Sequence, residues 1–343
     1  MVNLSYNPID GIEIDKIIAD VYTHNPTKIT IFNELEWELR QITPEFIQFL
    51  KDRNIKIEII FGSFYDSYYD NYCDRLGLDY SSLTFWPTFW FNWAEMSLKT
   101  EIDYTTHVIN TDFKYPFICL NNKNHTHRAA LIDHLSKYNL IDKGIVTWHK
   151  FSNYMHGYDF KYYDDSIRLI DDDFVTKLNS FLIPKQWHES FLHVVGEATI
   201  NTHFITEKTI IPILLKKPFV CISKQGYNQR LLDLGFVLYD EIIDYSYDNL
   251  EDVGDRADKL CESISKIPTN YSELYEILKP KIEHNYNRCL EIIKDRKFIP
   301  QTIVDRVAHM RTTRYRVAFI QYSNTIPMHT DHRYERILRE CND

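Results

Sequence analysis

Residues 191–220 constrain the fold more than any other stretch of the chain, because apolar and polar segments alternate there in a fixed order. An apolar run covers residues 191–195, and a polar connection follows at residues 196–204. Residues 205–215 carry apolar side chains at helical spacing, and Pro218 begins a second apolar run. This order predicts a strand, a loop, a helix and a second strand, as in a parallel α/β sheet.

The polar residues of this stretch predict a binding site. Glu197 follows the first strand directly, and Thr206, Glu207 and Lys208 open the helix. Backbone N–H groups at the start of a helix lack partners within it, and the helix dipole is positive there, so the position favours a bound anion. The alternative is that Glu207 and Lys208 form a solvated pair at the start of an amphipathic helix.

The first third of the chain shows the same alternation. Residues 28–32 and 55–61 predict strands, and between them Thr43-Pro44 is a typical helix start, with Thr as the N-cap. Ligands of parallel sheets bind beyond the carboxyl ends of the strands. The polar residues that follow these two strands are therefore candidates for a catalytic site: Glu34, Glu36, Ser63 and Asp66.

The pattern restarts near residue 113. The elements expected from there on are a strand over 117–120, a helix over 128–138, a strand over 144–148, the stretch described above, a short helix over 229–234, a strand over 235–239 and helices that reach about residue 293. We therefore expect an α/β fold with two Rossmann-like domains, over residues 1–112 and 113–299, and a C-terminal helical segment over residues 300–343.

Composition excludes several classes of protein. A chain of 343 residues is long enough for two domains, and its 44% of hydrophobic residues can fill two cores. A net charge of -10 argues against a surface that follows nucleic-acid phosphates. The apolar runs are too short for a membrane span, the N-terminus does not look like a signal peptide, and the cysteines lack zinc-site spacing. We expect a cytoplasmic protein with reduced thiols.

Residues 117–239 resemble the catalytic domain of the α1,3-fucosyltransferases, which belong to the GT-B glycosyltransferases. The run Phe-Ile-Cys-Leu-Asn-Asn, with His-Arg opening a helix at residues 127–128, is similar to the family's strand, Ser-Asn loop and Arg-Asn pair. Phe191 and Glu197 match the family's Phe-x-x-x-x-Glu-Asn in part. Phe-Ile-Thr-Glu-Lys at residues 204–208 is similar to its Tyr-Val-Thr-Glu-Lys.

The resemblance implies a nucleotide-sugar site in the second domain. In the family, the Glu that corresponds to Glu207 binds the nucleotide ribose and the Lys that corresponds to Lys208 binds the diphosphate, while Arg128 would also face the phosphates. The candidate donor-binding residues are Arg128, Glu197, Thr206, Glu207, Lys208 and Tyr227. Ala198 stands where the family has Asn, so one amide that could contact the donor is missing.

The resemblance also implies a GT-B-like architecture, in which the two parallel sheets face a cleft and the acceptor binds to the first domain. The reaction would be an inverting transfer of a sugar to a carbohydrate acceptor, without a metal or another cofactor and with GDP-fucose as the suggested donor. It needs one general base, for which Glu36 and Glu34 are the first candidates and Asp66 the next. Residues 234–248 also look like virus and marine-bacterial proteins related to this domain, so the location could be a host cytoplasm.

Other interpretations fit the same residues. Some viral GT-B proteins glycosylate modified DNA bases, and a protein could keep this fold as a carbohydrate-binding module without catalysis. Residues 171–173 (Asp-Asp-Asp) resemble the metal motif of the other large glycosyltransferase fold, but acidic residues in the first turn of a helix need no ligand. The histidines lack the helical spacing of a metal site, so we predict none. The oligomeric state stays open.

Overall fold

The computed structural model describes residues 3–6, 14–33, 42–88, 90–91, 94–95, 98, 109, 111–149, 157–169, 183 and 185–295. Among these residues, no helix is both long and apolar enough to cross a membrane. The predicted general bases Glu34 and Glu36, the Asp-Asp-Asp run at 171–173 and the predicted helical segment over 300–343 lie outside the described residues.

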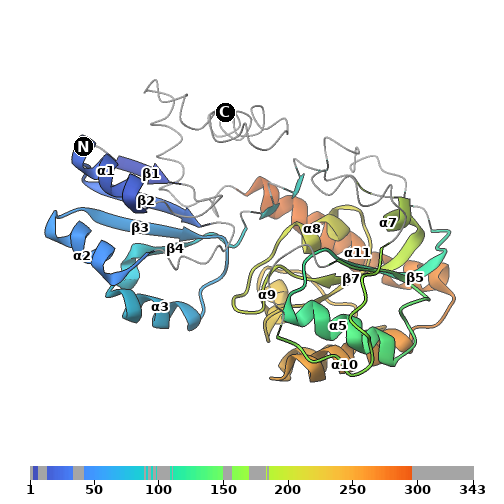
Figure 1. Ribbon diagram of the computed structural model, residues 1–343. Coiled ribbons are helices and arrows are strands. Elements are labelled where there is room, and N and C mark those ends of the chain that lie inside the picture. Colours follow the sequence, from blue (N-terminus) through green and yellow to red (C-terminus); the bar gives the residue numbers. More distant parts are fainter. Residues whose placement is uncertain are drawn as a thin grey trace.

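The strands between residues 3 and 85, a part that we call the first half of the molecule, form a parallel sheet in the order β1-β2-β3-β4, drawn in blue in Figure 1. Its elements are β1 (Asn3–Tyr6), α1 (Ile14–His24), β2 (Lys28–Asn33), α2 (Pro44–Asp52), β3 (Lys56–Phe61), α3 (Tyr68–Leu76), the short 3₁₀ helix η1 (Tyr80–Ser82) and β4 (Leu83–Phe85). The predicted start of α2 is confirmed, because the Thr43 side chain accepts a hydrogen bond from the Phe46 N–H at 3.3 Å.

The strands between residues 115 and 222, in the part that we call the second half of the molecule, form another parallel sheet, in the order β6-β5-β7-β8. Its elements are β5 (Tyr115–Asn121), α5 (Thr126–Lys137), β6 (Ile145–Trp148), α7 (Lys185–Glu189), β7 (Ser190–Gly196), α8 (Glu207–Leu214), β8 (Phe219–Ile222), α9 (Tyr227–Asp233), η2 (Tyr245–Asn249), α10 (Val253–Ser265) and α11 (Tyr271–Lys294). Contacts pair α5 with α10 and α8 with α11, and Figure 1 shows the two pairs on opposite faces of the sheet. The mixed α/β class with parallel sheets is therefore confirmed.

Two separate hydrophobic cores fill the two halves. The smaller one lies around β2, β3 and α2. The larger one surrounds β7, whose residues are all buried, as expected for a central strand with helices on both faces. Trp90, Phe91, Ala94 and Leu98 belong to the larger core although they precede the predicted boundary at residue 113. The boundary itself stays a prediction.

The loop after β3 joins the two halves. The Phe64 N–H donates to the backbone oxygen of His203 at 3.0 Å. The carboxylate of Asp66 binds the ammonium of Lys224 at 2.6 Å and lies 3.2 Å from Nδ1 of His203. His203 follows β7 and Lys224 follows β8, so the carboxyl-terminal edges of the two sheets are linked at this point.

One predicted strand is wrong. Residues 235–239 are irregular, and at their centre the backbone groups of Val237 bond a side chain instead of a neighbouring strand. Asn285 on α11 accepts a hydrogen bond from the Val237 N–H at 2.8 Å and donates its amide to the Val237 oxygen at 2.9 Å. A side-chain amide from α11 thus provides for Val237 the donor and the acceptor that a strand neighbour would provide.

Candidate anion-binding site

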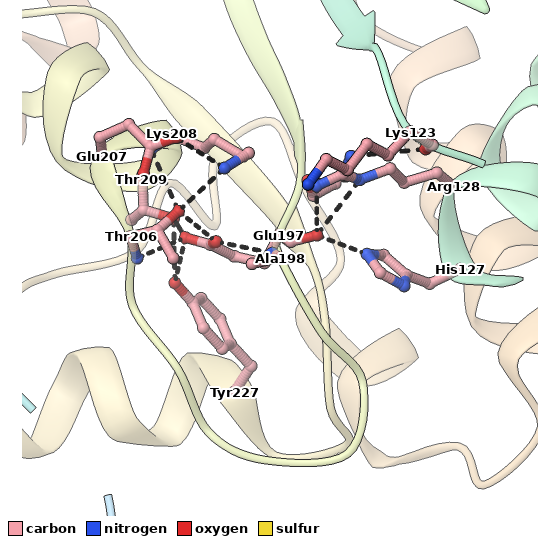
Figure 2. Close-up of polar contacts among 11 residues, drawn as sticks. Lys123, His127, Arg128, Glu197, Ala198, Thr206, Glu207, Lys208, Thr209 and Tyr227 are labelled. Atoms are coloured by element: carbon pink, nitrogen blue, oxygen red, sulfur yellow. Dashed lines mark hydrogen bonds and ion pairs between the residues drawn. The ribbon is translucent and has the colours of Figure 1, made fainter. Parts of the chain in front are cut away.

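Three cationic side chains converge at the carboxyl-terminal edge of the second sheet. Lys123 lies in the loop between β5 and α5, Arg128 lies in the first turns of α5, and Lys208 lies in the first turn of α8. Figure 2 shows Lys123 and Arg128 on one side of the loop that follows β7 and Lys208 on the other. This edge is where ligands bind in open parallel sheets.

The side chain of Glu197 binds the side of the site that carries Lys208. Its carboxylate is fully buried and accepts hydrogen bonds from the Thr206 N–H at 3.0 Å and the Thr206 hydroxyl at 2.6 Å. It also accepts from the Thr209 hydroxyl at 2.7 Å, the Tyr227 hydroxyl at 3.1 Å and the Ala198 N–H at 2.9 Å. Thr206 is the N-cap of α8, so the carboxylate fixes the start of the helix that carries Lys208.

The backbone oxygen of Glu197 binds the other side of the site. It accepts hydrogen bonds from Nη2 of Arg128 at 2.8 Å, Nε of Arg128 at 3.2 Å and Nε2 of His127 at 2.6 Å. The Arg128 guanidinium also donates to the backbone oxygens of Gly196 at 3.1 Å and Lys123 at 3.4 Å. One residue thus positions both α5 and α8, as Figure 2 shows.

The cations of the site disfavour one another's charge. Burial, and then repulsion by Lys208 and Arg128, lowers the pKa of Lys123. Burial, and then repulsion by Arg128, Lys123 and Lys208, lowers the pKa of His125 to about 4, so this side chain is neutral at pH 7. Burial also lowers the pKa of Arg128 to about 10, which leaves it protonated at pH 7. An anion placed among these groups would relieve their repulsion.

Glu207 is the carboxylate that partly balances this charge. Its Oε1 atom lies 2.6 Å from the ammonium of Lys208, and it also favours the charged forms of Lys123 and Arg128. The side chain of Glu207 is 19% exposed and that of Lys208 is 35% exposed, so both can meet a ligand. The structure therefore brings all six predicted donor-binding residues together. Glu197, Thr206 and Tyr227 are buried and bonded to one another, whereas Glu207 and Lys208 are partly exposed.

The sequence did not indicate Lys123, Thr209 or Gly196. Lys123 lies in a polar loop without periodicity, and Thr209 looks like an ordinary helical residue. Gly196 is needed for close packing, because a Cβ atom there would lie 2.7 Å from Cγ of Arg128. Only its place at the end of a strand, next to a candidate carboxylate, could have drawn attention to it.

Asp66 is poorly suited to the role of general base. Burial alone would raise the pKa of its carboxyl, but the nearby His203 imidazole, the Lys224 ammonium and the Tyr68 N–H outweigh this and lower the pKa to about 2. A carboxylate with so low a pKa is a weak proton acceptor near neutral pH. Among the described residues, no group of three or more His, Cys, Asp or Glu side chains could hold a metal ion.

The fold and the site define an α/β protein with two parallel sheets and a cationic cluster at the carboxyl-terminal edge of the second. Comparison of the chain with protein-family models, with curated proteins and with solved structures finds no match. A more specific description of the protein therefore rests on the chemistry of the cluster.

Proposed function

We propose that the cluster formed by Lys123, Arg128 and Lys208 binds the diphosphate of a nucleotide sugar, and that the protein is a glycosyltransferase. The convergence of these three cations at the ligand-binding edge of a parallel sheet carries the proposal. A departing nucleoside diphosphate accumulates negative charge, which preorganised cations and the start of α8 would stabilise. The three cations can do this without a metal ion.

Glu207 is the proposed ribose ligand. It neighbours Lys208 in the first turn of α8, and its partly exposed carboxylate can accept two hydrogen bonds from a ribose diol. Glu197, Thr206 and Tyr227 serve the donor indirectly in this proposal, because their mutual hydrogen bonds fix the position of that turn. GDP-fucose remains the donor that we propose.

The link between the two sheets supports a GT-B arrangement. Asp66 after β3 binds Lys224 after β8, so a ligand at the second sheet would have the first sheet's loops nearby. We propose that the first domain binds a carbohydrate acceptor and that an acidic residue, Glu36 or Glu34, deprotonates its hydroxyl for a single inverting displacement. The described cysteines are buried and unpaired, which supports a cytoplasmic location.

Calorimetry with GDP, UDP and ADP tests the proposal. We expect at least one of them to bind, and we expect Lys208→Ala and Lys123→Ala each to weaken its binding by about tenfold or more, because each removes a charged hydrogen-bond donor. Lys266→Ala is the matched control, because this exposed lysine pairs with Glu262 on α10. Failure of all three nucleotides to bind, or equal affinities for the two site variants and the control, would refute the proposed function.

A further inference from the structure

Two exposed tyrosines form an aromatic surface on the first half of the molecule. Tyr65 and Tyr80 are 44% and 45% exposed, and their rings meet edge to face with centroids 5.3 Å apart. Both rings also pack against the half-buried ring of Phe85, at 5.8 Å and 6.4 Å. We call Tyr65, Tyr80 and Phe85 the aromatic ledge.

The ledge is held in place before any ligand arrives. The Tyr65 hydroxyl donates to the carboxylate of Asp70, whose two oxygens lie 3.0 and 2.9 Å away. Phe85 packs in turn against the buried ring of Tyr69 at 4.9 Å. Aromatic rings that are fixed in this way lose little conformational entropy when they bind a partner. The exposed rings are therefore preorganised for contact.

The position of the ledge is that of a ligand site. Tyr65 lies in the loop after β3 and Phe85 is the last residue of β4, so both lie at the carboxyl-terminal edge of the first sheet. Tyr80 comes from η1, before β4, and reaches this edge by packing against both rings. The residue after Tyr65 is Asp66, which binds Lys224 of the second half. The ledge thus adjoins the place where the edges of the two sheets are linked.

The geometry of the ledge favours a sugar over a protein partner and over a cation. The exposed parts of the two tyrosines amount to roughly 200 Å², against roughly 800 Å² per partner in a stable protein interface. The touching rings of Tyr65 and Tyr80 leave no space between them for a cation. Their outward faces can instead pack against the apolar C–H face of a sugar, while the Asp70 carboxylate and the tyrosine hydroxyls can bond its hydroxyl groups.

We infer that the aromatic ledge binds a carbohydrate, which would be the acceptor of the transfer. The acceptor role rests on the proposed function, whereas sugar binding by the ledge can be tested alone. Tyr65 and Tyr80 supply the stacking faces, and Asp70 supplies both the anchor of Tyr65 and a hydrogen-bond acceptor at the rim. Direct contact with the sugar predicts that loss of either ring weakens binding.

Titrations with lactose, cellobiose and N,N′-diacetylchitobiose, followed by saturation-transfer NMR on the full chain, test this inference. We expect at least one disaccharide to bind, and we expect Tyr65→Ala and Tyr80→Ala to weaken it about tenfold. Tyr65→Phe keeps the ring but loses its hydrogen bond to Asp70, so it should weaken binding less than Tyr65→Ala. Tyr22→Ala, which removes a 67% exposed tyrosine of α1, is the control and should change nothing.

The outcomes separate this inference from the proposed function. Binding of none of the disaccharides, equal effects of the ledge and control variants, or binding of tetramethylammonium in place of sugars would overturn the ledge as a carbohydrate site. Nucleotide titrations of Tyr80→Ala should give the wild-type affinity. Sugar binding without nucleotide binding would overturn the proposed function alone, and nucleotide binding without sugar binding would overturn the ledge alone.

Discussion

A buried carboxylate is stable only where donors surround it, and Glu197 is such a case. Its two oxygens accept hydrogen bonds from the backbone and hydroxyl of Thr206, from Thr209 and from Tyr227. Each of these donors would lose one acceptor if the carboxylate were removed, although the hydroxyls of Thr209 and Tyr227 would still bond each other at 2.9 Å. The strength of the network therefore depends on one side chain, which its position after a strand and the family resemblance had suggested as a ligand for the donor.

Substitution of Glu197 should destabilise the protein. Glu197→Ala removes the common acceptor of several buried donors and should cost about 3–5 kcal/mol in the free energy of unfolding. Glu197→Gln keeps the shape but turns an amide donor toward other donors, which should cost about 1–3 kcal/mol. Urea unfolding measures both values.

The control is Glu262→Gln, at an exposed residue of α10 that pairs with Lys266, and it should change the free energy by less than about 0.5 kcal/mol. A Glu197→Gln protein as stable as wild type would contradict the role given to the network.

At the scale of secondary-structure elements, the sequence predicted most strands and helices because local signals and packing agree there. Thr43 and Pro44 begin α2 as expected. The helix expected from residue 205 begins at Glu207, because Thr206 is held outside it as an N-cap by the carboxylate of Glu197. The strand predicted around Val237 is wrong because the partner of Val237, Asn285, comes from a helix that is 48 residues away in the sequence. No local pattern reveals such a contact.

The packing of α5 against the end of β7 predicts the effect of Gly196→Ala. The new methyl group would meet Cγ of Arg128 at 2.7 Å and the side-chain oxygen of Asn121 at 3.1 Å, so the arginine must move. We expect a loss of about 1–3 kcal/mol in stability and weaker nucleoside diphosphate binding. Thermal unfolding and calorimetry measure the two effects.

Gly254→Ala is the comparison for this variant. It lies in α10, its new methyl group would approach only the side chains of Asp252 and Tyr158, and alanine favours the helix. We expect it to leave nucleotide binding unchanged. Equal nucleotide affinities for wild type and Gly196→Ala would contradict the assigned position of Arg128.

At the scale of the whole molecule, Asp66 has a different role from the one that the sequence suggested. Its position after β3 suggested a catalytic acid, but the partners that lower its pKa come from the other half of the chain. Sequence patterns give the order of elements within each half. They do not give the residues at which two halves meet, since these depend on packing between segments about 140 to 160 residues apart.

Asp66→Asn should weaken the link between the two sheets. The folded-state pKa of Asp66 is lowered from 3.8 to about 2, so its contribution to stability is present above about pH 4 and is lost as the pH falls through 2. The shift corresponds to about 2 kcal/mol at neutral pH. Urea unfolding at pH 7 should show this loss, and the variant's stability should change less than that of wild type between pH 4 and pH 2.

Asp74→Asn, at an exposed position of α3, is the control. Small-angle X-ray scattering should show a larger radius of gyration for Asp66→Asn than for the control, because the halves lose a direct ion pair. Identical stability and scattering of the two variants would show that this ion pair does not hold the halves together.

Glu197 binds one helix through its carboxylate and another through its backbone oxygen, and this predicts how substitutions at position 197 would behave in a mutational scan. Its carboxylate holds the start of α8, which carries Lys208, and its backbone oxygen holds Arg128 on α5, yet its side chain is fully buried. In a screen for activity, position 197 would therefore group with the positions that contact a ligand. In a screen for protein abundance it would group with the core, while Lys208 would not.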